Sequence, residues 1–245
     1  MKVAAGTIWN GNSNKAGLTT QAAYAITNNF AATLSYNTQS EKEKRDVDWS
    51  LIFPSRSSDI GRYYTRKNFS IGGGYYKVVG QKRNRSLNLY GGVGFGKVNV
   101  REDEVLLHYS AQQETMLNVR HHHKVTRYYL HPSYSIMPGK VFRGNFGARF
   151  TLAHFNAFTS DLPKEELDRR YWTMEKKTSL YFEPSVNLQF FVIPDVMAFD
   201  MGFTLNVRMT PSKNSLPMSS DFTVDHMNAN RSLIFYTRFS FDFSR

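Results

Sequence analysis

Charged side chains occur inside several segments of this chain that are apolar at every second residue. In residues 180–192 the apolar positions alternate with polar ones that include Glu183, and residues 142–152, 197–209 and 233–243 follow the same pattern. Alternate residues point to opposite faces of a β-strand, so each segment is predicted to be a strand with its charges on one face. The predicted charged set is His131, Arg143, Arg149, Glu183, Asp200, Arg208, Arg238 and Asp242.

Four arginines and three carboxylates on one inner surface can either pair with each other or line a path for ions or substrate. Buried charges without partners are costly, so we expect pairing and favour a structural ionic network. Strand pairing through a turn at Pro194 would place Glu183 opposite Thr204 or Asn206 and one pair away from Arg208.

Two other groups of residues resemble chemical motifs. His121-His122-His123 could bind a transition metal, but consecutive side chains point in different directions, so a solvated loop is the preferred interpretation. The glycines of 72–74 and 91–96 resemble phosphate-binding loops, yet they lie inside predicted strands with no helix following. Close approach to large neighbours, or a bend in a barrel, explains them better. We therefore predict no metal site and no cofactor.

A hydrolase of the rim-sited kind would need paired carboxylates and a histidine near one end of a barrel. The candidates are His154, Asp161, Asp221, Asp225 and His226. Nothing in their spacing singles out a base and its orienting partner, so we predict that the protein is not an enzyme.

The same alternation predicts ten strands, at residues 2–9, 18–26, 30–39, 68–79, 87–100, 128–137, 142–155, 178–192, 196–209 and 232–243. The links after the second, fourth, sixth and eighth are short, namely 27–29, 80–86, 137–141 and 193–195. The links after the third, fifth, seventh and ninth are about twenty residues or longer. Short turns at one end and long loops at the other are typical of outer-membrane barrels, whereas a soluble barrel or sandwich has no reason to sort its loops.

The predicted fold is therefore all-β: a single antiparallel up-and-down transmembrane β-barrel over residues 1–245, with short periplasmic turns and long extracellular loops. Negative mean hydropathy excludes a helical membrane protein, whereas a barrel needs apolar residues only at every second position. The cysteine-free chain begins without an apolar secretory core, so we interpret it as a mature or trimmed form located in the bacterial outer membrane. Aromatic residues expected at the membrane interfaces are Tyr24, Tyr36, Tyr75, Tyr128, Tyr134, Phe155, Phe190 and Phe243.

Pro132 and Pro184 both occupy outward-facing positions of their predicted strands, in matching sequence contexts. We interpret both as bulge sites, the alternative being that each strand breaks there.

The net charge of +11 is assigned mostly to predicted connectors, including Arg66, Lys67 and Arg127. Basic loops at the outer surface are expected to meet lipopolysaccharide phosphates or an acidic partner. The basic residues are scattered over both ends, which argues against nucleic-acid binding.

Residues 18–32, with the run Gln21-Ala22-Ala23-Tyr24-Ala25-Ile26-Thr27, resemble the first hairpin of a group of Bacteroidetes-type outer-membrane β-barrel proteins, many of them lipoproteins. The glycine-rich segment 69–76 and the aromatic closing strand fit this resemblance. The upstream acylated cysteine of that group is absent, and Ser244-Arg245 follow the terminal aromatic residue. Because the function of the group is mostly unassigned, the resemblance implies location more than activity.

The predicted function is a structural or accessory subunit of a larger outer-membrane assembly, bound to its protein partner through extracellular loops or the barrel wall. A narrow channel for small solutes is the alternative, followed by a rim-sited hydrolase.

Overall fold

The computed structural model describes residues 2–10, 15–48, 57–80, 84–108, 113–137, 141–161, 178–194, 196–209 and 231–243. Within these ranges the chain forms ten strands: β1 Lys2–Asn10, β2 Lys15–Ala25, β3 Phe30–Asp48, β4 Ser57–Val79, β5 Arg85–His108, β6 Gln113–Ile136, β7 Phe142–Ser160, β8 Thr178–Ile193, β9 Met197–Arg208 and β10 Arg231–Asp242. No helix in the described part of the chain is long and apolar enough to cross a membrane.

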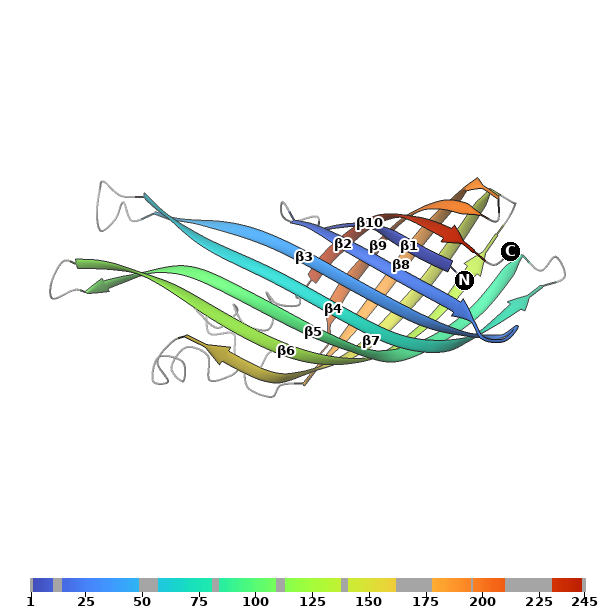
Figure 1. The fold of residues 1–245 in the computed structure, drawn as a ribbon, viewed down its shortest axis with the longest axis horizontal. Coiled ribbons are helices and arrows are strands. Elements are labelled where there is room, and N and C mark those ends of the chain that lie inside the picture. The colour runs from blue at the N-terminus through green and yellow to red at the C-terminus, as the bar shows by residue number, and fades with distance from the viewer. Residues whose placement is uncertain are drawn as a thin grey trace.

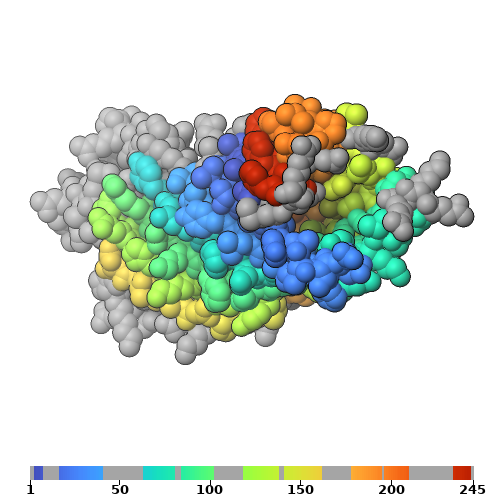
Figure 2. Space-filling model, turned by 45° about the vertical axis from the view of Figure 1, so that its right-hand side comes forward, coloured from blue at the N-terminus to red at the C-terminus, as the bar shows by residue number. Residues whose placement is uncertain are grey.

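The strands form a closed antiparallel barrel in which every strand pairs with its neighbours in sequence. The barrel closes between the first and last strands, with Lys2 opposite Asp242 and Asn10 opposite Ile234. The space-filling view shows the N-terminal strands, in blue, directly against β10, in red (Figure 2). The predicted ten-strand barrel is confirmed.

Both ends of the chain lie at the end of the barrel that carries the short turns (Figure 1). The β2–β3 turn is held by the amides of Ile26 and Thr27, which both donate to the Phe30 carbonyl. In the β4–β5 turn Gly80 has a φ of 87°, a left-handed conformation that glycine adopts without a steric penalty. This end faces the periplasm in outer-membrane barrels with an even number of strands.

The opposite end differs from the prediction in an informative way. The strands β3, β4, β5 and β6 contain 19, 23, 24 and 24 residues, whereas β1, β2, β9 and β10 contain only 9 to 12. Most of the predicted long loops at 40–67 and 101–127 are therefore strand, paired up to Asp48 with Ser57 and up to His108 with Gln113. Two long hairpins extend from the barrel at the left of Figure 1.

The predicted bulges at Pro132 and Pro184 are wrong. Pro132 lies opposite Leu89 and Pro184 opposite Ala148 with no shift of register at either position. Each proline is paired on one side, whereas on the other side the pairing is interrupted at 131–132 against β7 and at 183–184 against β9. The register is unchanged across both gaps, so neither proline is a bulge. The irregularities lie instead between Lys124 and Val125, against β7, and between Phe191 and Ile193, against β9.

Candidate functional site

The outer surface changes its chemistry abruptly along each long strand. On β5 the outward residues Leu87, Leu89 and Phe95 are about half exposed and apolar, and the next outward residues in the same strand are Lys97, Asn99 and Arg101. The apolar part covers nine residues, which matches the length that a tilted strand needs to cross a bilayer. On β6 the change falls between Tyr128 and Lys124. Lipid therefore meets the barrel up to this boundary.

The inner surface changes at the same boundary from polar, within the membrane region, to mostly apolar beyond it. Below it, β5 and β6 direct polar residues such as Asn88, Ser133 and His131 inward. Above it, the inward residues are almost completely buried and mostly apolar or aromatic: Tyr64, Val98, Val100, Val119, His121, His123, Val125 and Phe155. We call this group the extramembrane core. Its presence means that the long hairpins stand on folded structure and not on solvated loops.

An ion pair lies just below the extramembrane core. Nε of Arg149 on β7 is 3.3 Å from Oε2 of Glu183 on β8, and the Thr151 hydroxyl donates to the same oxygen over 3.1 Å. The Arg149 guanidinium also stacks on Tyr129, 4.5 Å from the ring centre. On β9, Phe182 lies opposite Val207 and Ser185 opposite Thr204, which places Glu183 level with Asn206. Its ion pair, however, is with Arg149 on the other neighbouring strand, β7.

Glycines make room for these large side chains inside the barrel. A Cβ atom on either Gly72 or Gly92 would collide with the hydroxyl of Tyr129, which lies across β4 and β5. One on Gly147 would meet the ring of His131. The glycines therefore leave space for the large side chains next to the ion pair, which fits the interpretation that large neighbours approach the backbone closely.

A second ion pair crosses the closing strands. Nε of Arg238 on β10 is 2.8 Å from Oδ2 of Asp200 on β9, and its Nη1 donates to Oε1 of Gln21 on β2 over 2.7 Å. Gly6 on β1 lies between β10 and β2, and a Cβ there would collide with the backbone and Cβ of Arg238. Asp200 is only 1% exposed, so removal of its partner would leave a buried charge.

The other predicted lumen residues are spread along the barrel. Arg143 lies near the periplasmic end, where it contacts the Met137 sulfur and the Phe191 ring. Arg208 is opposite Tyr181, and Asp242 is opposite Lys2. The structure thus brings together Arg149 with Glu183, close enough to His131 for their charges to act on it, and Arg238 with Asp200.

Two lumen arginines were not predicted. Arg127, assigned above to a loop, is an inward residue of β6 whose Nη1 donates to Oδ1 of Asn68 over 3.0 Å. It lies close enough to Glu183, Arg149 and Arg66 for their charges to act on it. Arg66 is on β4 and not in a loop. The alternation of the strand could have found Arg127, because it is separated by two and four residues from Tyr129 and His131, which face inward on the same strand.

The histidine triplet also lies in a strand and not in a loop. His121 and His123 point inward and are buried, while Nδ1 of the exposed His122 is 2.9 Å from Oδ1 of Asn99. His123 packs against Phe155 and Phe158, with ring centres 5.3 and 5.0 Å apart. Burial lowers the pKa of His123 from 6.5 to about 4, so it is neutral at physiological pH. Among the described residues no three histidine or carboxylate side chains form a group that could hold a metal ion.

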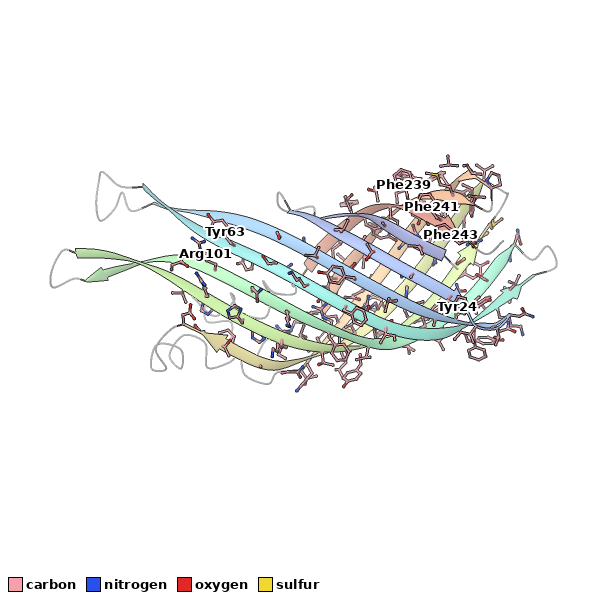
Figure 3. All side chains as sticks on the ribbon, in the orientation of Figure 1. Tyr24, Tyr63, Arg101, Phe239, Phe241 and Phe243 are labelled. Atoms are coloured by element: carbon pink, nitrogen blue, oxygen red, sulfur yellow. The ribbon has the colours of Figure 1, made fainter. Side chains whose placement is uncertain are left out.

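Most of the predicted interface aromatics face outward. Tyr24, Tyr75, Phe190 and Phe243 lie toward the turn end, and Tyr36 and Tyr128 lie toward the hairpin end. Tyr134 is half-buried on the outward list of β6. Figure 3 shows Tyr24 and Phe243 far from Tyr63 and Arg101, which mark the hairpins (Figure 3).

Phe155 was wrongly placed at the membrane interface. It is 1% exposed and packs with Val125, Ala153 and Tyr181 inside the extramembrane core. Because alternate residues of β7 face the same side, Phe155 faces inward together with Thr151 and Ala153, whereas the exposed Phe146 and Phe150 face outward.

The residues considered for a hydrolase do not converge within the described chain. His154 lies on the outward side of β7, where its Nδ1 is 3.0 Å from the Thr178 hydroxyl. Asp161 is exposed beside Arg120, whose carbonyl accepts its amide hydrogen. Asp221, Asp225 and His226 lie outside the described residues.

Comparison with known proteins identifies the fold. No protein-family model matches the chain, and no curated protein matches it either. Among solved structures, the translocator domain of the autotransporter NalP from Neisseria meningitidis is similar, with a TM-score of 0.52 and 10% identity over 99% of this chain and 88% of that one. LpxR from Salmonella typhimurium aligns at a TM-score of 0.41 and 8% identity, covering 99% of this chain and all of that one. The NanC porin aligns at a TM-score of 0.37 and 10% identity, covering 98% of this chain and 99% of that one.

The closed antiparallel barrel and its outward apolar band define the class of protein. A band of exposed leucine, phenylalanine and tyrosine that encircles a closed barrel is stable only where lipid covers it. The protein is an outer-membrane β-barrel located in the bacterial outer membrane.

Proposed function

We propose that the protein is an accessory subunit of an outer-membrane assembly, whose barrel is an anchor and whose β3–β6 hairpins bind a protein partner outside the membrane. The extramembrane core is the observation that carries this proposal. Val98, Val100 and Val119 are no more than 4% exposed although they lie beyond the lipid boundary. A chain that buries apolar side chains outside the bilayer holds its hairpins in a defined shape, as a binding surface requires.

The backbone of the hairpins offers a further argument. Pairing between β4 and β5 ends at Arg62 with Glu102, yet β3–β4 and β5–β6 continue to Ser57 and His108. The described segments 57–61 and 103–108 are thus paired on one side only by the described strands. Unpaired strand edges are templates for an added strand of another chain, which is a recurrent mode of protein recognition.

Gentle detergent extraction followed by identification of co-purifying proteins tests this proposal. The decisive variants replace residues 43–62, or residues 102–119, by Asn-Gly, a two-residue turn that joins the register pairs Lys42 with Tyr63 or Arg101 with Arg120. We expect the partner to be lost while the barrel still folds, as judged by heat-dependent gel migration. A control that replaces the exposed Lys77 and Arg85, at the opposite end of β4 and β5, by glutamine should keep the partner. A protein that extracts only as a lone monomer would overturn the proposal.

A narrow conduit for small anions is the second candidate, favoured by the arginines of the lumen. The charges of Arg66, Arg149 and Glu183 all act on Arg127, so three arginines lie near the Glu183 carboxylate. Against conduction, Val125, Ala153, Phe155 and Tyr181 form a buried apolar cluster directly above this layer on the β6–β8 side. The accessory role predicts no unitary current in a planar bilayer, whereas a reproducible anion current would favour the conduit. Membership of the Bacteroidetes-type group stays a prediction.

A further inference from the structure

Three lysines lie in one row across the outer face of the barrel. The register places Lys67 on β4 directly opposite Lys97 on β5, and Lys97 directly opposite Lys124 on β6. All three side chains are exposed. Neighbouring strands are about 4.8 Å apart, so the three ammonium groups are attached within about 10 Å of each other. We call this group the lysine row.

The lysine row is electrostatically unfavourable by itself. Like charges directly opposite each other destabilise a pair of strands. No described residue forms an ion pair with any of the three lysines, and the next outward positions on the same strands are Thr65, Asn99 and His122. His122 and Asn99 are already joined to each other. Within the described residues no carboxylate is paired with the row, so a molecule outside the chain can supply the negative charge.

The position of the row indicates which molecule supplies that charge. The outward residues one step nearer the membrane on β3, β4 and β5 are Tyr36, Phe69 and Phe95, paired in a line and 38 to 53% exposed. They are the last aromatic residues of the apolar band. The lysines therefore stand at the depth of lipid headgroups, with acyl-chain contacts immediately below them.

Further cations lie above the row. Arg101 and Arg120 are opposite each other two positions farther out, and the Arg101 guanidinium stacks on Tyr63 at 5.3 Å from the ring centre. Figure 3 shows Tyr63 and Arg101 side by side on the outer part of the hairpins. The surface thus offers aromatic side chains, then ammonium groups, then guanidinium groups in the order in which a phosphorylated glycolipid presents acyl chains, phosphates and outer anionic groups.

We propose that Lys67, Lys97 and Lys124 form a binding site for the phosphate groups of an outer-leaflet glycolipid, with Tyr36, Phe69 and Phe95 in contact with its acyl chains. The lipid is the source of the phosphate, because the ammonium groups stand against the membrane and next to lipid-facing rings. This site is on the barrel wall and is independent of the proposed protein partner.

Native mass spectrometry of the full chain, incubated in detergent with purified lipid A, tests the proposal. At about 1 kcal/mol per lysine, the variant K67Q/K97Q/K124Q should bind roughly a hundredfold more weakly than the native chain. The charge-preserving variant K67R/K97R/K124R should bind like the native protein. A matched control, K77Q/R85Q, removes two exposed cations at the periplasmic end and should also leave binding unchanged.

Two further probes distinguish the lipid from its parts. Lipid A stripped of phosphate should bind as weakly to the native chain as intact lipid A binds to the glutamine variant, and a thousandfold excess of inorganic phosphate should not displace intact lipid A. If the triple variant fails to fold, Lys97→Gln alone, which removes the central charge, should still weaken binding several-fold. Unchanged lipid A binding by the folded glutamine variant, or full displacement by inorganic phosphate, would overturn the proposal.

Discussion

The membrane-spanning barrel and the extramembrane hairpins are built from the same continuous strands, yet their two faces have exchanged roles. In β6 the outward residues Leu130 and Tyr128 are apolar and the inward residue His131 sits among charges. A few residues farther along, the outward Lys124 and His122 are polar and exposed, while the inward Val125 and His123 are buried. The backbone pairing continues through this change with one local shift of register.

The difference shows that the surroundings, and not the secondary structure, set the side-chain pattern. In lipid, apolar residues face outward and the enclosed polar groups must satisfy each other. In water, apolar residues turn inward and form a core of the kind found in soluble β-sheets. The following predictions separate the two regions from the largest expected effect to the smallest.

Phe155→Ala should destabilise the folded protein by about 3–5 kcal/mol, because it leaves a cavity among Val125, Ala153 and Tyr181. The matched change in the membrane region is Phe150→Ala on the outward face of the same strand. Lipid fills the space there, so only the transfer term of about 2 kcal/mol is lost. Urea unfolding in vesicles measures both values, and a cost for Phe155→Ala no greater than that for Phe150→Ala would refute the extramembrane core.

Leu130→Arg should cost about 2–4 kcal/mol, since it places a charge against the hydrocarbon. The same residue introduced eight positions earlier on the same outward face, His122→Arg, should change the free energy of unfolding by no more than about 0.5 kcal/mol. Equal costs at the two positions would mean that the lipid boundary does not fall between them.

Acidification should weaken the extramembrane core and leave the barrel folded. The pKa of His123 is lowered to about 4 by burial, so below pH 6.5 the unfolded segment takes up a proton that the folded one resists. The stability of the hairpins should be complete above pH 6.5, fall by roughly 2–3 kcal/mol as the pH drops toward 4, and change little further from this source below 4.

Hydrogen exchange of residues 98–100 and 119–125 as a function of pH measures that change. His123→Leu should abolish most of the pH dependence, and His122→Ala, on the exposed face, should keep it. An unchanged pH profile in His123→Leu would show that His123 is not the responsible group.

The barrel could be predicted from sequence because its alternation is regular and the short turns are marked by Pro138, Gly139 and Pro194. The hairpins could not, because the prediction ended the strands at residues 39 and 100 and began the next ones at 68 and 128, and it assigned the polar, charged segments between them to loops. Beyond Phe95 the outward residues become lysine, asparagine and arginine, a pattern that a solvated loop would also give. The missing signal was the alternation on the inward face, where every second residue is apolar or histidine: Val98 and Val100 in one strand, and Val119, His121, His123 and Val125 in the next.

The lumen shows a similar limit. Arg149 with Glu183 and Arg238 with Asp200 were both in the predicted charged set, but which residues pair depends on register across strands far apart in the sequence. Gln21 accepts a hydrogen bond from Arg238 over 217 positions of chain, across a neighbouring glycine. Nothing local in the sequence specifies such a partner.

The cysteine-free chain allows the most direct test of where lipid ends and water begins. Single cysteines are placed at the outward positions 89, 93, 95, 97, 99 and 101 of β5 and at its inward positions 98 and 100. In protein reconstituted in vesicles they can be spin-labelled and tested for collision with oxygen, which enters lipid, and with a water-soluble nickel chelate. We predict oxygen accessibility through Phe95, a switch to the nickel chelate from Lys97 onward, and accessibility to neither reagent at the inward positions 98 and 100. Oxygen accessibility that continues to Arg101, or free access of the nickel chelate to positions 98 and 100, would contradict the account.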